Sequence, residues 1–177
     1  MNAEELRLLQ APLKTRYKEE PAAALVTLRA LGRVAQSTLT CALETGKPGI
    51  PAGLHPAAGG DGLSACSGDL LLEALVGCAG VTLAAVATAM GIELKTALVI
   101  AEGDLDFRGT LGVARDAPVG FSNLRLRFEI DSDAPADKLH KLVELSERYC
   151  VVFKTLAQPP SIEVCTVVSA EQAGSGG

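Results

Sequence analysis

The sequence contains no tryptophan, only two tyrosines and only four phenylalanines in 177 residues. Apolar residues still make up 48% of the chain, and most of them are Ala, Leu and Val, so the core must be built from small aliphatic side chains. Charged residues make up 21%, a usual share for a globular protein. A chain of this length is expected to form one domain, with room for an additional arm.

The sequence also lacks any cluster of Lys or Arg, and its net charge is -5. We therefore expect neither a nucleic acid nor an anionic membrane surface as a partner. The first 20 residues are charged and lack the apolar h-region of a signal peptide. The expected location is the cytoplasm, where cysteines are kept as thiols.

Metal-binding patterns are missing as well. There is no CxxC motif, and the two histidines, His55 and His140, do not cluster with cysteines. A structural zinc site is therefore not expected, and no bound cofactor is expected either. The five cysteines stand apart from one another in the sequence, at Cys41, Cys66, Cys78, Cys150 and Cys165.

One long apolar run, Leu70 to Met90, is long enough to cross a membrane. However, Glu73 lies inside it, Gly and Ala lower its hydrophobicity, and basic flanks are missing. The run therefore predicts a helix enclosed by protein. A helix of about 22 residues is about 33 Å long, which a lone domain of this size can scarcely enclose, so we expect an obligate dimer.

The remaining patterns predict an α+β fold with antiparallel sheet, because strands joined by short turns alternate with helices. We expect an N-terminal helical arm at residues 1–21, a main domain at 22–168 and a disordered tail at 169–177. Gly32 and Arg33 are expected near the first turn between strands. The predicted strands are 23–34, 37–45, 94–101, 105–113, 123–131 and a last one from 161, with a Gly- and Pro-rich loop at 46–68 and a second long helix at 133–150.

Each cysteine has an inert interpretation, because free Cys is among the most buried residue types. Cys41 and Cys165 lie in predicted strands and read as core residues, and Cys66 lies in a loop without a charged partner. Cys78 and Cys150 lie in predicted helices. A cysteine becomes reactive where a positive charge or a helix N-terminus favours its thiolate, and the residues alone do not show this for Cys78.

Three segments together resemble the OsmC/Ohr family of thiol-dependent peroxidases. They are LLLEALVGCAGVTL, LDFRGTLG and ERYCVVFKTL, and the likeness spans roughly residues 22–168. Its main feature is one cysteine in each of two long helices, Cys78 and Cys150. The resemblance implies an OsmC-like fold, with antiparallel sheets around two central helices in an intertwined homodimer and with the active sites at the subunit interface.

The same resemblance implies a reaction. Cys78 attacks an organic hydroperoxide, or hydrogen peroxide in some members, and becomes a sulfenic acid. Cys150 then condenses with it to a disulfide, which a dithiol reduces; in the Ohr branch this reductant is a lipoylated protein. A resolving thiol stops oxidation before the irreversible sulfinic stage.

In the Ohr branch an arginine after the first strand and a glutamate before the first central helix hold the thiolate. Arg33 is the candidate arginine. The position of the glutamate is occupied here by Gly68, so the nearest acid is Asp69, one residue off and shorter. Glu73 lies about 140° around the helix from Cys78 and is expected to face elsewhere. These departures favour the broader OsmC-like group.

Two other functions stay open at this stage. One is a non-catalytic OsmC-like dimer that binds a small apolar ligand at its interface. The other is a stress-linked structural protein whose buried cysteines are inert. The feature that separates the enzyme from both is whether the thiols of Cys78 and Cys150 can meet.

Overall fold

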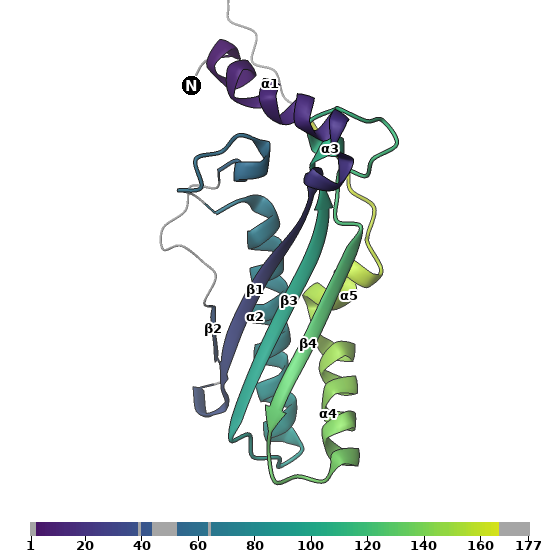
Figure 1. Ribbon diagram of the computed structural model, residues 1–177. Helices are drawn as coiled ribbons and strands as arrows, with labels where there is room; N and C mark the ends of the chain where they lie inside the picture. Colours follow the sequence, from purple (N-terminus) through teal and green to yellow (C-terminus); the bar gives the residue numbers. More distant parts are fainter. Residues whose placement is uncertain (1–2, 39, 44–52, 64, 167–177) are drawn as a thin grey trace, which may run out of the picture.

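A computed structural model describes residues 3–38, 40–43, 53–63 and 65–166. The chain forms a four-stranded antiparallel sheet with helices on one of its faces (Figure 1). This confirms the predicted mixture of helices and antiparallel sheet. The strand order is β2-β1-β3-β4, with β1 at Leu25–Ala35, β2 at Thr40–Leu43, β3 at Thr96–Asp106 and β4 at Asn123–Asp131.

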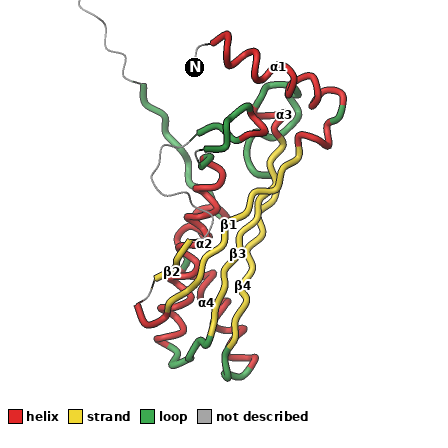
Figure 2. Tube along the Cα trace, turned by 60° about the vertical axis from the view of Figure 1, so that its left-hand side comes forward, coloured by secondary structure: helices red, strands yellow, loops and turns green. Residues whose placement is uncertain are grey.

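The helices are unequal in length, and the longest runs along the sheet (Figure 2). They are α1 (Ala3–Glu19), α2 (Ser67–Ala89), α3 (Phe107–Thr110), α4 (Ala136–Tyr149) and α5 (Val151–Ala157). Three 3-10 turns accompany them: η1 (Pro21–Ala24), η2 (Gln36–Thr38) and η3 (Pro56–Ala58).

The sheet buries one face because alternate side chains of each strand point to the same side. In β4 every second residue, from Leu126 to Ile130, packs against the main core, while the residues between them are exposed. In β1, Val26 and Val34 belong to the same core. The side of the sheet that α2 covers is therefore the apolar one.

Helix α2 forms the centre of this core. Fully buried side chains along it include Leu72, Val76 and Leu83. It begins with a capping box, in which the Asp69 carboxylate accepts a hydrogen bond from the Cys66 amide at 3.2 Å. It is long and apolar enough to cross a membrane by length and composition, but half of that stretch is buried inside the protein, as in a core helix.

The predicted N-terminal helix lies across one end of the sheet as α1 (Figure 1). The hydroxyl of Tyr17 donates to the Ala57 carbonyl at 2.7 Å, and the Gln10 amide donates to the Ala58 carbonyl at 3.2 Å. Tyr17 is buried with Phe107 and Leu111 in a second, smaller cluster. The helix therefore covers η3 and α3.

The predicted strand 94–101 is confirmed from Thr96 onward, whereas the predicted strand 105–113 is wrong beyond Asp106. A single strand, β3, runs through to Asp106, and the chain then makes the short helix α3. The reason is local, because the Asp106 carboxylate accepts hydrogen bonds from the backbone amide and the guanidinium of Arg108. This Asp cap begins a helical turn where sequence alternation alone predicts extended chain.

Two further expectations at the C-terminal end also differ. The predicted helix 133–150 ends at Tyr149, and Cys150 has an extended backbone with φ -71° and ψ 109° before α5 begins. Residues 161–166 form no strand, and their apolar side chains Ile162 and Val164 are each 86% exposed. The predicted tail at 169–177 lies outside the described residues. Of the predicted strand 37–45, residues 37 and 38 belong to η2 and residues 40–43 form β2, while 39, 44 and 45 lie outside the described residues.

Candidate thiol site

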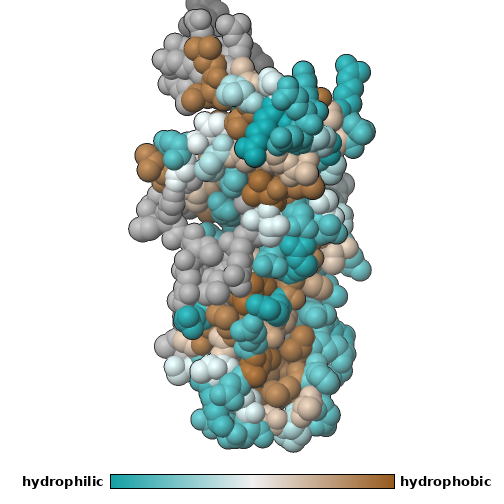
Figure 3. Space-filling view, in the orientation of Figure 1, coloured by the Kyte–Doolittle hydropathy of each residue, from teal (hydrophilic) through white to brown (hydrophobic). Residues whose placement is uncertain are grey.

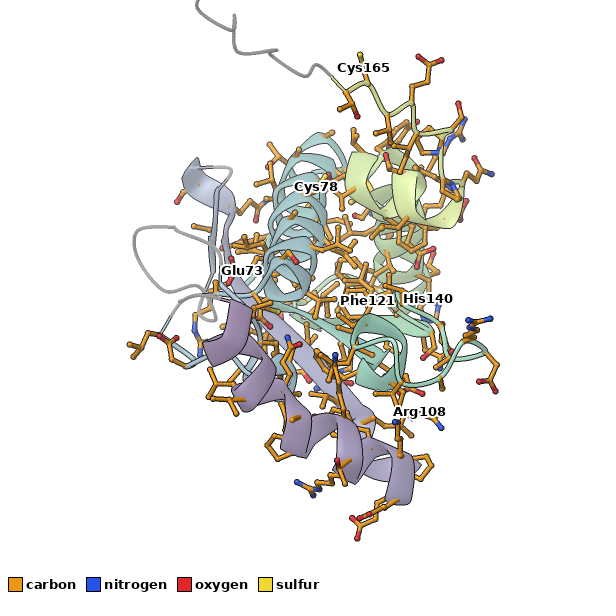
Figure 4. The ribbon with its side chains drawn as sticks, turned by 90° about the horizontal axis from the view of Figure 1, so that it is seen from above. Glu73, Cys78, Arg108, Phe121, His140 and Cys165 are labelled. Carbon is orange, nitrogen blue, oxygen red and sulfur yellow. The ribbon has the colours of Figure 1, made fainter. Side chains whose placement is uncertain are left out.

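Cys78 lies midway along α2, half-buried, on the side of the helix that faces α5 (Figure 4). Cys150 is 1% exposed and joins α4 to α5. The thiol of Cys150 lies beside the sulfur of Cys78 and acts as its hydrogen-bond donor, so the two thiols are neighbours. Both are free thiols in this structure.

The break at Cys150 positions the start of α5 against Cys78. Because its backbone is extended, the sulfur of Cys150 serves as the N-cap of α5 and accepts a hydrogen bond from the Phe153 amide at 3.4 Å. The next free amides of this first turn, those of Val151 and Val152, donate to the sulfur of Cys78. If the helix were continuous through Cys150, these amides would donate to backbone carbonyls four residues earlier and would not be available to Cys78.

The electrostatics of Cys78 favour its thiolate. Burial of the thiol opposes ionisation, but hydrogen bonds from the Val152 amide, the Cys150 thiol, the Val151 amide and the Thr82 hydroxyl outweigh it and lower the pKa of Cys78. The single hydroxyl hydrogen of Thr82 serves either the Cys78 sulfur or the Cys78 carbonyl oxygen, which lies 2.8 Å from the Thr82 oxygen. The strongest influences on the Cys78 pKa are thus burial and neutral donors, rather than a neighbouring cation.

Cys150 has the opposite character. Burial raises the pKa of its thiol to about 11, and the adjoining Cys78 adds to this because Cys150 acts as its hydrogen-bond donor. The Phe153 amide works in the other direction without reversing the shift. One thiol of the pair is therefore favoured as a thiolate and the other remains protonated beside it.

Arg33 is not brought to Cys78 within one chain. It lies inside β1, paired in register with Leu98 and two residues before the strand ends, so it is near the first turn as expected but not in it. Its neighbour Val34 packs against the core under α2, so the exposed Arg33 points to the opposite face of the sheet. That face bears hydrophilic residues beside an apolar patch (Figure 3).

Asp69 lies at the start of α2, where its carboxylate caps the helix. Nine residues separate it from Cys78, which corresponds to about 13.5 Å along the axis and to roughly the opposite side of the helix. Glu73 is buried and projects from a different side of α2 than Cys78, as expected (Figure 4). The roles of Arg33 and Asp69 at the thiolate stay predictions.

The other cysteines lie elsewhere. Cys66, expected in an open loop, is 7% exposed as the N-cap of α2, and burial raises the pKa of its thiol. Cys165, expected in a strand core, is exposed. Cys41 is in β2 as predicted, but the structure does not describe its side chain. Within the described residues, no group of three or more His, Cys, Asp or Glu side chains could hold a metal ion.

The sequence reasoning missed three contributors to the site: Thr82 and the amides of Val151 and Val152. Thr82 could have been found, because a residue four positions after Cys78 lies beside it on a helix. The amides could not, because the sequence gives no sign that the helix breaks at Cys150.

Comparison with known proteins shows which family this chain belongs to and which solved structure has a similar fold. The family described as OsmC-like protein matches residues 60–164, which is more than half of the chain. The chain belongs to the OsmC-like family. The crystal structure of an OsmC-like hydroperoxide resistance protein from Jannaschia sp. CCS1 is similar in fold, with a TM-score of 0.59 and 16% identity over 84% of this chain and 97% of that one. Among curated proteins, none matches the chain.

A first prediction concerns the ionisation of this OsmC-like protein. Iodoacetamide alkylates the thiolate form of Cys78. The alkylation rate should therefore reach half its maximum at a pH below the pKa of about 8.5 of a free cysteine. Thr82→Val removes a donor and should raise the pKa of Cys78, which lowers the alkylation rate at neutral pH by roughly threefold. Mass spectrometry of the Cys78 peptide measures the rate.

Thr88→Val is the matched control, because Thr88 donates to the Ala84 carbonyl in the same manner but lies ten residues from Cys78. It should leave the alkylation of Cys78 unchanged. An ionisation pH for Cys78 above that of a free cysteine would contradict the electrostatic account.

Proposed function

We propose that this OsmC-like protein is a cysteine-based hydroperoxide reductase. The observation that carries the proposal is that Cys78 and Cys150 are neighbours, and that their pKa values are shifted in opposite directions. A peroxidase needs a thiolate nucleophile. It also needs a second thiol close enough to close a disulfide.

The reaction begins at Cys78. Its thiolate attacks the terminal oxygen of ROOH, the O–O bond breaks, and the sulfur gains that oxygen and becomes a sulfenic acid. The other oxygen leaves as alkoxide and takes up a proton to give ROH. The Cys150 thiol, which donates toward Cys78 in the reduced protein, is the nearest proton source.

Cys150 then resolves the intermediate. Having given its proton to the alkoxide, Cys150 attacks as a thiolate at the sulfur of the sulfenic acid. A disulfide forms, and the hydroxide that leaves takes up a proton from solvent to become water. Because Cys150 is almost fully buried while Cys78 is half-buried, Cys150 is protected from direct oxidation by peroxide. Fast resolution keeps Cys78 from reaching the sulfinic stage.

A dithiol completes the cycle. Its first thiolate attacks the disulfide at the more accessible sulfur, that of Cys78, and its second thiol closes a ring that releases Cys78. Two electrons pass from the dithiol to the protein, and both cysteines return to thiols. A lipoylated protein carries a dithiol of this kind, and the cytoplasm is the compartment in which such thiols stay reduced.

We also infer a homodimer built on α2. A stripe of residues, all exposed except the half-buried Cys78, runs along the helix at alternating spacings of three and four residues: Leu71, Ala74, Cys78, Val81, Ala85 and Thr88. Most of these side chains are small, so a second helix can approach closely. We assign the C-terminal half of the stripe, where Val81 is 41% exposed, to the contact with α2 of a second copy. The exposed segment at Ile162 and Val164 is a further apolar surface available to that copy.

The non-catalytic alternative is favoured by one feature, an apolar cavity of about 210 Å³ that Leu75 lines with residues of β4 and α5. A protein that only binds an apolar ligand there has no use for a low Cys78 pKa. It predicts that both thiols survive exposure to hydroperoxide.

A second prediction separates the enzyme from this alternative. Cumene hydroperoxide should be consumed catalytically in the presence of dithiothreitol, and Cys78→Ser should abolish the consumption. Cys150→Ser should give one turnover, after which mass spectrometry shows Cys78 with two added oxygen atoms. Both outcomes follow from the separate roles of nucleophile and resolving thiol.

Cys165→Ser is the control, because Cys165 is exposed and outside the site, and it should retain the activity of the parent. If Cys78→Ser consumes hydroperoxide as fast as the parent protein does, the proposed function is wrong.

A third prediction tests the dimer. Val81→Arg places a charge in the proposed helix contact and should shift the protein from dimer to monomer in sedimentation velocity, since a buried unpaired charge is strongly unfavourable. Val119→Arg is the control, because Val119 is more exposed, at 66%, and lies outside α2. A parent protein that sediments as a monomer would rule the assembly out.

A further inference from the structure

An open groove of about 500 Å³ lies at the junction of α4 and α5. Cys150 lines it, together with side chains from the end of α4, from α5 and from the segment that follows α5. Because the Cys150 thiol is the neighbour of Cys78, the groove borders the pair of thiols. The reaction described above makes no use of this surface.

The groove carries positive charge only. Arg148 and Lys154 both line it and are exposed, and none of the described residues that line it is Asp or Glu. Within the part of the chain that the structure describes, neither cation forms an ion pair. The whole chain has a net charge of -5, so the sign of the charge is reversed locally. A negatively charged partner is attracted to this groove and is repelled by the chain as a whole.

Aromatic rings lie against both cations, and apolar side chains lie between them. The guanidinium carbon of Arg148 is 5.5 Å from the centre of the Tyr149 ring, and the Nζ of Lys154 is 5.8 Å from that of Phe153, which are cation–π distances. Tyr149 is 57% exposed and Val151 is 70% exposed. Tyr and Arg are enriched at the centres of protein–protein interfaces. An open groove with exposed apolar side chains suits a protein segment better than a small molecule, which is usually enclosed.

We propose that this groove is the docking surface for the protein that reduces the disulfide between Cys78 and Cys150, and that this partner carries its dithiol in a segment rich in Asp and Glu. The inference rests on the proposed function. Carboxylates of the partner pair with Arg148 and Lys154, and its apolar groups cover the exposed side chains between them. Two electrons and two protons pass from the dithiol, which becomes a disulfide, to the protein disulfide, which becomes two thiols.

The test compares three reductants of the protein after oxidation by one equivalent of cumene hydroperoxide. Two are peptides with the same dithiol, flanked by glutamates in one and by glutamines in the other, and the third is uncharged dithiothreitol. Each peptide rate is divided by the rate at which that peptide reduces hydroxyethyl disulfide, which corrects for the effect of the flanking charges on the peptide thiols. At low ionic strength the Glu peptide should react about tenfold faster than the Gln peptide, because opposite charges steer the encounter. In about 1 M salt the Debye length falls to about 3 Å, and most of this preference should be lost. Thiol titration of quenched samples measures the rates.

Charge reversal locates the effect. The double variant Arg148→Glu with Lys154→Glu should lose the preference for the Glu peptide, which lowers the rate with that peptide by about tenfold. Its rate with dithiothreitol should stay that of the parent, which shows that the thiol site is intact. Arg148→Gln with Lys154→Gln should give an intermediate rate. The matched control is Arg115→Glu with Lys138→Glu, because both residues are exposed and lie outside the groove. It changes the net charge equally and should keep most of the preference.

Three results would overturn the inference. If the two peptides reduce the parent equally fast, or if the Arg148 and Lys154 reversal keeps the parent's preference, the groove is not the docking surface, although the reductase proposal stands. If that reversal instead converts a dimer to a monomer in sedimentation velocity, the occupant of the groove is a second copy of the chain. If cumene hydroperoxide produces no disulfide between Cys78 and Cys150, the proposed function fails and this inference fails with it.

Discussion

The interaction on which the site depends is the set of hydrogen bonds from the first turn of α5 to the sulfur of Cys78. Those amides are available only because the chain leaves helical geometry at Cys150 and begins a new helix. The same break turns the Cys150 thiol toward Cys78 and buries it. One backbone feature thereby lowers the pKa of one thiol, raises that of the other and holds the two beside each other.

The rest of the fold supports this arrangement. The sheet gives α2 an apolar surface along its whole length, and α4 and α5 cover the side of α2 next to Cys78. The stripe of α2 passes through the half-buried Cys78, so the nucleophile borders the part of the helix that we assign to a second copy. A cation is not needed to explain a low Cys78 pKa in this protein, which fits the absence of the Ohr-type acid at position 68.

Much of this could be predicted from the sequence, and the failures have physical reasons. The buried helix is signalled by a long apolar run and β4 by strict alternation, and both were predicted correctly. The helical turn at Phe107–Thr110 was missed because a single carboxylate, Asp106, sets it. The pairing of Cys78 with Cys150 came from resemblance, not from spacing, because long-range contact leaves no local pattern. The break at Cys150 was missed because its neighbours Tyr149 and Val151 carry no turn signal.

The most direct measurement of the central claim is the identity of the disulfide formed in the first turnover. The reduced protein is treated with one equivalent of hydroperoxide, alkylated and digested, and the linked peptides are identified by mass spectrometry. The account predicts one dominant bond, between Cys78 and Cys150 of the same chain. A dominant bond to Cys66 or Cys165, or Cys78 recovered as an unmodified thiol, would contradict it.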